Sequence, residues 1–178
     1  MQRIVLTGGP GAGKTALLAE LATMGYTTVQ ESARAIIAER LASGRSRRPS
    51  PLDFAKEVLR RDIEKYLSAR QTSEWVFFDR GVLDGLGLLQ EVSPLPSIEL
   101  HTMLSTYRYH NPVFILPPWK AIYANDAERD QTFAQAVAIH AGLERWYHSC
   151  GYIVHEIPRA SISERARYVL RVLAERQA

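Results

Sequence analysis

A glycine-rich segment near the start of the chain has the residue types and spacing of a phosphate-binding loop. Residues 8–15 read GGPGAGKT, which fits the pattern G-x-x-x-x-G-K-[ST]. Glycines let the backbone approach a phosphate closely and point successive N–H groups at it. The lysine reaches the β- and γ-phosphates, and the hydroxyl that follows it suits Mg²⁺. We predict that a nucleoside triphosphate binds here, with Thr15 as a magnesium ligand, through Gly8, Gly9, Pro10, Gly11, Ala12, Gly13, Lys14 and Thr15. A strand–helix turn without a ligand is the alternative.

A second candidate site is an acid–arginine pair at the end of an apolar run. Residues 75–79, WVFFD, end in Asp79, and Arg80 follows directly. This order is typical of small-molecule kinases built around a phosphate-binding loop. In them the acid holds Mg²⁺ or assists the nucleophile, and the arginine lies over the transferring phosphoryl group. We predict these roles for Asp79 and Arg80. The alternative is that Asp79 caps the next helix and Arg80 is solvated.

A glutamate and an arginine follow the second predicted strand. Residues 26–30, YTTVQ, have β propensity, and Glu31 and Arg34 come immediately after them. Ligands of open α/β sheets collect at the edge where the carboxyl ends of the strands meet, which is also the edge of the glycine-rich loop. We predict that Glu31 binds an acceptor hydroxyl or takes its proton, and that Arg34 pairs with a substrate anion. In the alternative, Glu31 caps a helix and pairs with Arg34 on the surface.

A polar segment that follows two prolines has the composition of a lid. Residues 118–130 contain Trp119 and the run NDAERD, in which Asp126 and Arg129 lie about one helical turn apart. We predict that the segment closes over the nucleotide, that Arg129 then reaches the phosphates, and that closure excludes water. A charged helix start with surface pairs is the alternative.

The elements that must position these residues alternate between strand and helix. Short apolar runs bounded by glycine or proline predict strands at 3–7, 26–30, 75–79, 112–116 and 152–157. Helical spacing predicts helices at about 14–24, 32–41, 51–67, 82–107 with a proline interruption, 130–149 and 162–173. Strands that are apolar throughout and alternate with helices indicate a parallel sheet covered on both faces. We expect one α/β domain over residues 1–178.

Composition and charge limit the class of protein. The chain has 178 residues, of which 46% are hydrophobic and 23% charged, values typical of a globular domain with a sizeable core. No apolar run approaches the roughly 20 residues of a membrane-spanning helix. The net charge of +3 is too small to indicate a nucleic-acid partner. The first residues lack a signal-peptide pattern, and the single Cys150 cannot form an internal disulfide, so we expect a cytoplasmic protein.

Two other classes of nucleotide-binding protein fit the sequence less well. A Ras-type GTPase has an Asn/Thr-Lys-x-Asp motif after a late strand, and this sequence has none. Residues 84–87, DGLG, match the pattern D-x-x-G, which is too loose to carry the assignment. A large AAA+ ATPase usually ends a strand in Asp-Glu, whereas here Arg80 follows the acid. These differences favour a small-molecule kinase.

Taken together, the motifs resemble those of a known family. The segments GGPGAGKT, ESAR, FFDRG and DAER, with GYIVHEIP and S-x-x-E-R near the end, look like the small AAA-domain P-loop family. That family is similar to the nicotinamide-riboside kinase domain of the bacterial bifunctional NAD regulator and to other nucleoside-type kinases. The resemblance extends over nearly the whole chain.

The resemblance implies both a fold and a position for the nucleotide base. The implied fold is the three-layer P-loop NTPase fold, with a five-stranded parallel sheet in the order 2-3-1-4-5 and helices on both faces. The resemblance also implies that the base lies near the loop after the last strand, around Pro158 and Arg159. Some members of the family bind GTP, so membership does not decide the substrate.

The remaining polar segments are weaker candidates. Residues 43–51, SGRSRRPSP, are interpreted as a solvated, disordered loop, with a flap beside the acceptor or a polyanion contact as alternatives. The histidines show no metal-ligand spacing with acids or with Cys150. Cys150 precedes a glycine at a helix end and is expected to pack rather than to react.

These predictions combine into one reaction. We expect a kinase that transfers the γ-phosphoryl group of Mg-ATP, with GTP as an alternative donor, to a hydroxyl of a small, nucleoside-like acceptor. Lys14, Arg80 and Arg129 would neutralise the transferring group. Two alternatives stay open. One is a nucleotide-dependent switch or slow ATPase with a protein or lipid partner, and the other is a nucleic-acid end kinase that uses the arginines of residues 45–48.

Overall fold

A single parallel sheet organises the protein. The structure, a computed structural model, describes residues 2–69, 74–123 and 131–175. Its strands pair in the order β2-β3-β1-β4-β5, all in parallel, which confirms the predicted order. The strands are β1 (Gln2–Gly8), β2 (Thr27–Val29), β3 (Trp75–Asp79), β4 (Val113–Leu116) and β5 (Val154–Glu156).

The helices lie where the sequence predicts them, with one refinement. They are α1 (Lys14–Thr23), α2 (Ser32–Ala42), α3 (Pro51–Ser68), α4 (Val82–Val92), α5 (Ser97–Thr106), α6 (Phe133–Ser149) and α7 (Ile162–Glu175), with a 3₁₀ turn η1 (Lys120–Ile122). The predicted region 82–107 forms two helices, because Pro94 and Pro96 lie between α4 and α5 and cannot continue a helix. None of the helices in the described part of the chain combines the length and apolar composition that a membrane crossing needs.

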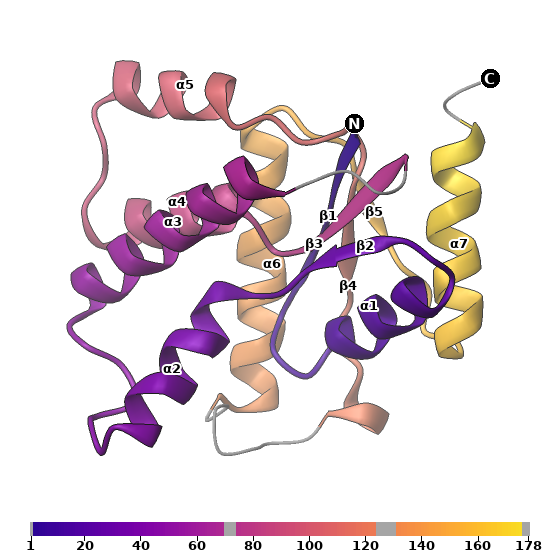
Figure 1. Ribbon diagram of the computed structural model, residues 1–178, viewed down its shortest axis with the longest axis horizontal. Helices are drawn as coiled ribbons and strands as arrows, with labels where there is room; N and C mark the ends of the chain where they lie inside the picture. Colours follow the sequence, from indigo (N-terminus) through magenta and orange to yellow (C-terminus); the bar gives the residue numbers. More distant parts are fainter. Residues whose placement is uncertain (1, 70–73, 124–130, 176–178) are drawn as a thin grey trace.

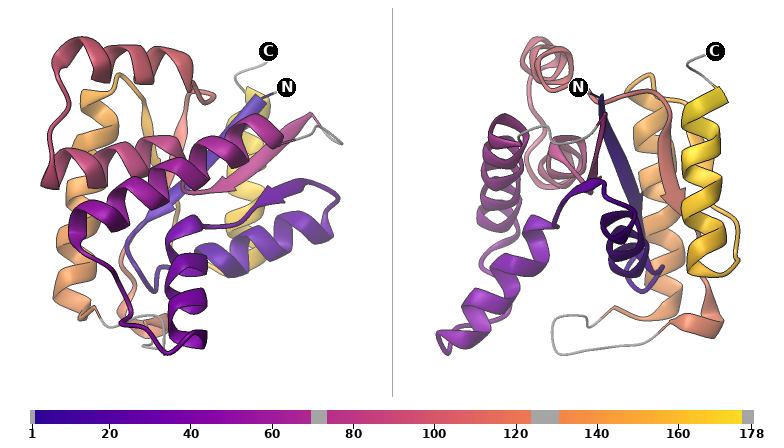
Figure 2. Two further views of the ribbon diagram at one scale, coloured as in Figure 1. Left: turned by 60° about the vertical axis from the view of Figure 1, so that its left-hand side comes forward. Right: turned by 45° about the vertical axis from the view of Figure 1, so that its right-hand side comes forward.

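Two apolar layers enclose the sheet, because successive strand residues point to opposite faces. Ile4 and Leu6 pack against α1 and α7, whereas Val5 belongs to the cluster formed with α3, α4 and α6. All three side chains are fully buried, and burying one of this size stabilises the fold by about 1.5–3 kcal/mol. Figure 1 shows α3 and α4 on one side of the sheet and α1 and α7 on the other, and Figure 2 shows the same layers from two further directions.

The strand register brings the candidate site residues to one end of the sheet. Leu6 of β1 is paired with Asp79 of β3, and Gly8 of β1 with Leu116 of β4. The Arg80 backbone N–H donates to the Leu6 carbonyl at 2.9 Å, so the chain leaves β3 directly beside the glycine-rich loop. In Figure 1 this carboxyl end of the strands faces downward, and the marks for both termini lie at the opposite end.

Candidate active site

The predicted phosphate-binding loop connects β1 to α1. Gly8 has a φ of 137°, and a Cβ built on it would lie 2.6 Å from the Leu116 carbonyl oxygen. Gly13 has a φ of 90° and forms the N-cap position of α1. Only glycine tolerates such a conformation together with such close neighbours. The loop therefore presents backbone rather than side chains at the positively polarised end of α1, which suits an anion.

Lys14 is held across this loop. Its side chain is buried, and Nζ donates to the Gly8 and Gly9 carbonyl oxygens at 3.1 Å each. Burial and the neighbouring Arg80 guanidinium lower the pKa of Lys14. The adjacent Thr15 is exposed and lines the same cavity, so both side chains predicted to act on phosphate and metal lie at this loop.

Asp79 ends β3 with an unsatisfied carboxylate oxygen. The residue is 5% exposed, and its Oδ1 is buried without a hydrogen-bond partner. Burial raises the pKa of Asp79 to about 6; Lys14 opposes the shift, and Glu31 adds to it. A buried oxygen that lacks a donor is a suitable ligand for a hard cation such as Mg²⁺. Within the described residues there is no cluster of three or more metal-ligating side chains.

The alternative in which Asp79 caps α4 and Arg80 is solvated is wrong. The N-cap of α4 is Gly81, whose N–H donates to the Asp84 carboxylate at 3.1 Å. The Arg80 side chain is 18% exposed and fully engaged with protein oxygens. The chain turns between Asp79 and α4. The carboxylate that binds the start of the helix is therefore that of Asp84 and not that of Asp79.

Arg80 joins three elements of the site. Its Nε donates to Glu31 at 3.0 Å, Nη1 to Asp84 at 3.2 Å, and Nη2 to the Gly8 carbonyl at 2.8 Å. Burial lowers the pKa of Arg80, but the carboxylates of Glu31, Asp84 and Asp79 outweigh it, so the net shift is upward. Its φ of 63° is in the left-handed region, which costs a non-glycine residue free energy and is concentrated at functional sites.

Asp84 is a site residue that sequence reasoning missed. It is 4% exposed and accepts hydrogen bonds from Thr7 at 2.7 Å and Tyr147 at 2.6 Å, in addition to those from Arg80 and Gly81. The match of residues 84–87 to D-x-x-G is not a loop, because these residues lie within α4. The available signal was a single carboxylate in the apolar helix VLDGLGLL, which needs buried partners.

Glu31 and Arg34 lie at the start of α2. Glu31 occupies the N-cap position of α2, but its side chain makes no capping bond and pairs with Arg80 instead. Burial raises the pKa of Glu31, but Arg80, Lys14 and Arg34 outweigh this effect, so the net pKa is lowered. The predicted alternative of a capping Glu31 therefore does not describe the structure. Glu31 and Arg34 both line the cavity beside the loop.

One large cavity is lined by most of these groups, namely Lys14, Thr15, Glu31, Arg34, Arg80 and Asp84, whereas Asp79 is not among its lining residues. Its volume is about 1480 Å³, above the range of roughly 300–1,000 Å³ that is usual for a small-molecule site. One end lies at the loop and the start of α7, and the other end lies between α2, α3, α4 and α6. Its lining residues away from the loop include Ile37, Phe54, Val58, Asp62, Leu88, Trp119, Trp146, Ala160, Ser161, Ile162 and Arg165.

The predicted base-binding residues lie at the rim of this cavity. Pro158 and Arg159 are exposed, and Arg159 Nε donates to the Pro118 carbonyl at 3.2 Å. The residues that line the cavity follow directly after them. Arg165, also missed, is 4% exposed, lies 4.6 Å from the Trp119 ring centroid and donates to the Ala12 carbonyl at 3.3 Å. It ends the S-x-x-E-R segment of the sequence, which is the signal that pointed to it.

The predicted lid is described only in its first part. Trp119 and Ile122 line the cavity, and η1 lies between β4 and the undescribed segment. Asp126 and Arg129 lie outside the described residues, so the predicted contact of Arg129 with the phosphates stays a prediction.

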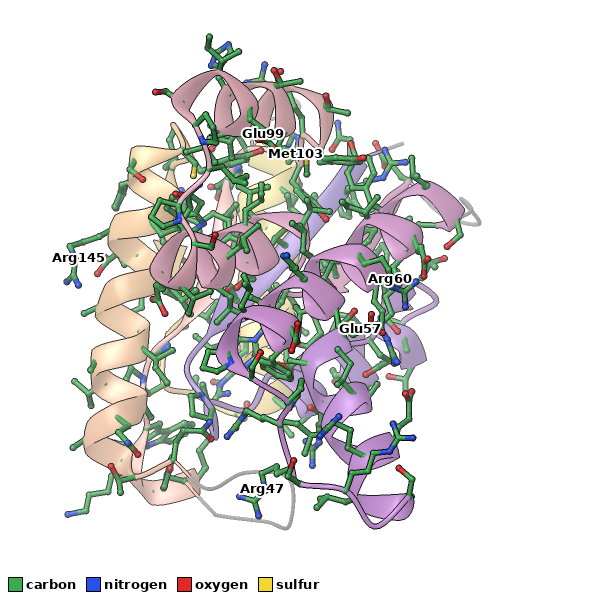
Figure 3. All side chains as sticks on the ribbon, turned by 90° about the vertical axis from the view of Figure 1, so that its left-hand side faces the viewer. Arg47, Glu57, Arg60, Glu99, Met103 and Arg145 are labelled. Atoms are coloured by element: carbon green, nitrogen blue, oxygen red, sulfur yellow. The ribbon has the colours of Figure 1, made fainter. Side chains whose placement is uncertain are left out.

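The arginine-rich loop has defined contacts. Arg40 donates to the Ser46 carbonyl at 2.8 Å, and Arg48 stacks over Phe54 and lines the cavity. Figure 3 shows Arg47 in the same loop, which joins α2 to α3. The interpretation as a disordered loop is therefore wrong, because side chains of both flanking helices hold the loop. Arg48 brings this loop to the edge of the cavity, and the alternative of a flap beside an acceptor stays a prediction.

Cys150 is unsuited to nucleophilic chemistry. Burial raises the pKa of its thiol to about 11, so the thiolate is scarce near neutral pH. The packing role expected for this residue is consistent with its partly buried position at the end of α6.

Sequence comparison identifies the family. The profile of an AAA domain family matches residues 3–165, most of the chain. The chain belongs to this AAA domain family. The match includes every site residue described above, from the loop to Arg165. No curated protein matches the chain.

Solved structures place the AAA domain chain in the fold of nucleoside and nucleotide kinases. Deoxyadenosine kinase from M. mycoides with bound dATP has 13% identity and a TM-score of 0.62, over 97% of this chain and 100% of that chain. Thymidylate kinase from Ehrlichia chaffeensis has 15% identity and a TM-score of 0.60, over 97% and 100%. NadR protein in complex with NR has 15% identity and a TM-score of 0.69, over 98% of this chain and 51% of that chain. The resemblance noted in the motifs is thus confirmed at the level of the fold.

Proposed function

We propose that this protein is an ATP-dependent kinase of a small, nucleoside-like acceptor. The donor would be Mg-ATP, with GTP as the alternative donor, and the group transferred would be the γ-phosphoryl group. The likeness to deoxyadenosine kinase, thymidylate kinase and NadR supports the class of acceptor, and the loop 8–15 supports the class of donor.

The position of Arg80 carries the proposal. The same guanidinium touches the Gly8 carbonyl of the phosphate-binding loop and the carboxylate of Glu31 on the acceptor side. A cation between the phosphate-binding loop and the carboxylate that would bind the acceptor lies where negative charge develops during phosphoryl transfer. An enzyme that only hydrolyses ATP needs no binding site for a second substrate. Here α2, α3 and α4 line a continuous cavity beyond Arg80, which offers room for one.

Lys14 and Arg80 would stabilise the phosphates together. Both side chains are held in place by carbonyl oxygens of the loop, so little reorganisation is needed when an anion arrives. The backbone N–H groups of the loop and the first turn of α1 would bind the remaining phosphate oxygens. Arg129 would add a further cation from the lid.

Thr15 and Asp79 would hold Mg²⁺. Their donor atoms are a hydroxyl and a carboxylate, the unpartnered Oδ1 of Asp79 being buried beside Lys14. Bound Mg²⁺ would neutralise charge on the phosphates.

Glu31 would orient the acceptor hydroxyl. Because its pKa is lowered by Arg80 and Lys14 despite burial, Glu31 is anionic at neutral pH and a weak base. An anionic oxygen accepts a hydrogen bond from a hydroxyl strongly and so aligns it for attack. The loose transition state of phosphoryl transfer does not require a strong base. Arg34, near Glu31, would pair with an anionic group of a substrate.

The direct test is ATP consumption with and without a panel of nucleosides. We expect slow ATP hydrolysis alone and at least a tenfold faster rate with an accepted nucleoside, accompanied by a phosphate ester of that nucleoside. Asp79→Asn should lower the rate and weaken its dependence on Mg²⁺, while Asp53→Asn, on the exposed start of α3, should change neither. Equal ADP formation with every nucleoside, and no ester, would support the switch or ATPase alternative instead.

A further inference from the structure

A pair of buried polar side chains lines the cavity beside Glu31 and has no role in the proposed reaction. Ser32 begins α2 and is 1% exposed, and Asp62 is in the fourth turn of α3 and is 6% exposed. Both line the cavity. Asp62 lies close enough to Glu31 and Asp84 for their charges to raise its pKa, so the pair is next to the acceptor side of the site.

The two side chains have few protein partners for their depth of burial. Ser32 Oγ is buried and makes no well-formed hydrogen bond. Its hydroxyl lies close enough to Asp62 for a weak hydrogen bond, which lowers the pKa of that carboxyl group. Among the described residues no cation forms an ion pair with Asp62, and Lys65, one turn further on, donates instead to the Gln30 carbonyl at 2.7 Å.

Close helix packing fixes the position of the carboxyl group. A Cβ built on Gly85 of α4 would lie 3.0 Å from Leu59 Cα and 3.3 Å from Asp62 Oδ2. The two helices therefore touch at Gly85, and Asp62 is confined between them. A buried polar group costs free energy unless it is hydrogen-bonded, and folded proteins retain such groups mainly where a ligand or water completes them.

The walls around the pair are apolar. Ile37 comes from α2, Phe54 and Val58 come from α3, and Leu88 comes from α4. An apolar slot with a few polar groups at its end is the usual form of a site for a flat or cyclic molecule, whose orientation the polar groups decide.

We propose that Ser32 and Asp62 form a subsite for a hydrogen-bond-donating group, O–H or N–H, on the ring of the acceptor. The inference rests on the proposed kinase function and narrows the acceptor to ring compounds that carry such a donor in addition to the hydroxyl that is phosphorylated. Asp62 accepts the hydrogen bond, and Ser32 Oγ supplies a second contact to the same edge of the ring.

The test measures nucleoside binding by calorimetry in the presence of Mg-ADP, so that turnover is not required. The probes are the four common ribonucleosides and nicotinamide riboside. For the tightest of them, analogues that each lack one hydroxyl or amino group are then compared. We expect one analogue to bind the wild type about 10- to 100-fold more weakly, since its donor no longer reaches a buried carboxyl group.

Variants assign that loss to the pair. Asp62→Leu should weaken binding of the parent nucleoside by about the same factor. In this variant the parent and the analogue should bind equally tightly, as expected if the donor group contacts Asp62 directly. Ser32→Ala should weaken binding about 3- to 10-fold, and Asp62→Asn should fall between wild type and Asp62→Leu. Glu64→Gln is the matched control, because Glu64 lies on α3 but pairs with Arg60 at the surface; Figure 3 shows Arg60 on the outer side of this helix.

The outcomes separate this inference from the proposed function. If the wild type phosphorylates a nucleoside but Asp62→Asn and Ser32→Ala bind it as tightly as the wild type does, the subsite is rejected and the kinase stands. If the wild type binds none of the probes in the presence of Mg-ADP, both proposals fail. Should Asp62→Leu not fold, Asp62→Asn and Ser32→Ala decide the matter by themselves.

Discussion

The charged side chains of the site divide into those that are paired and those that are not. Glu31 and Asp84 both form ion pairs with Arg80, which offsets the free-energy cost of placing them inside the protein. Asp79 and Asp62 have no ion-pair partner among the described residues, and burial raises the pKa of each. At the scale of single residues, the unpaired groups are the ones left to bind a metal ion or a substrate.

Removal of Lys14 should impair chemistry more than folding. Lys14→Ala deletes a cation that the proposed transfer needs, so we expect the turnover number to fall by about 10²- to 10³-fold. The circular dichroism spectrum should stay unchanged, because the hydrogen bonds of the Lys14 side chain within the described residues all go to carbonyl oxygens of the loop. Lys56→Ala, an exposed lysine of α3, is the control. Wild-type turnover in Lys14→Ala would reject the assigned role of the loop.

Asp62 makes the stability of the fold depend on pH. Burial, with Asp84 and Glu31, raises its pKa from 3.8 to about 7, while Ser32 and Lys65 act in the opposite direction. Between about pH 4 and pH 7 the folded state therefore holds a proton that the unfolded state releases, and this contribution to stability is lost as pH rises. Asp62→Asn removes the ionisable carboxyl group, and with it the free-energy cost of a buried negative charge at high pH.

The expected result for Asp62→Asn is a gain in stability at high pH only. In urea unfolding at pH 8, its free energy of unfolding should exceed that of the wild type by about 1–3 kcal/mol. At pH 4 the two proteins should differ little, because both are then uncharged at this position when folded. An equal difference at both pH values would show that the carboxyl group does not titrate as described.

At the scale of elements, Asp84 ties β1, α4 and α6 together. Its carboxylate accepts hydrogen bonds from Thr7 of β1 and from Tyr147 of α6. It also accepts one from the backbone N–H of Gly81, the N-cap residue of α4. Arg80, fixed by the same carboxylate, thereby takes its position from helices on one face of the sheet. The orientation of the arginine over the loop is thus a property of several packed elements.

Removal of one donor to Asp84 should loosen this assembly measurably. Tyr147→Phe deletes the 2.6 Å hydrogen bond in a fully buried position and leaves the carboxylate with fewer donors. We expect the free energy of unfolding to fall by about 1–3 kcal/mol in urea titration. Tyr168→Phe is the control, because the Tyr168 hydroxyl makes no hydrogen bond to the residues that the structure describes. Equal losses in the two variants would contradict the special role of Tyr147.

At the scale of the whole molecule, one cavity extends between two parts of the fold. The loop and the start of α7 form the first end, and α2, α3 and α4 form the second. The likeness to solved kinases at 10–15% identity extends over nearly the entire chain, so the arrangement of layers is shared although few residues are.

Mg-ATP should stabilise the whole protein against heat. At a concentration 100-fold above the dissociation constant, binding adds about 2.7 kcal/mol to the free energy of unfolding. For a chain of this length that corresponds to a rise in Tm of roughly 5–10 °C, measurable by differential scanning fluorimetry. Chelation of Mg²⁺ should remove most of the rise, and Lys14→Ala should show little of it. No shift with either ATP or GTP would count against nucleotide binding.

Local patterns in the sequence were enough to predict the loop, the strands and the sheet order implied by the family. The glycines of residues 8–13, the buried run ending in Asp79 and the prolines between α4 and α5 each act over a few residues, so the chain reveals them directly. The cap at Ser50, which accepts a hydrogen bond from the Asp53 N–H, is another local feature of this kind.

Only the tertiary structure decided which distant groups share a partner. The surroundings of the residues that sequence patterns missed are formed by neighbours far along the chain. Asp84 accepts a hydrogen bond from Tyr147, and Arg165 donates one to the Ala12 carbonyl. Ser32 and Asp62 likewise come from different helices. The sequence records the residue type but not the depth of burial, and burial is what makes a missing hydrogen-bond partner costly. The sequence therefore predicted a phosphate-binding loop between β1 and α1, whereas packing of α3 against α4 decided which side chains line the cavity between these helices.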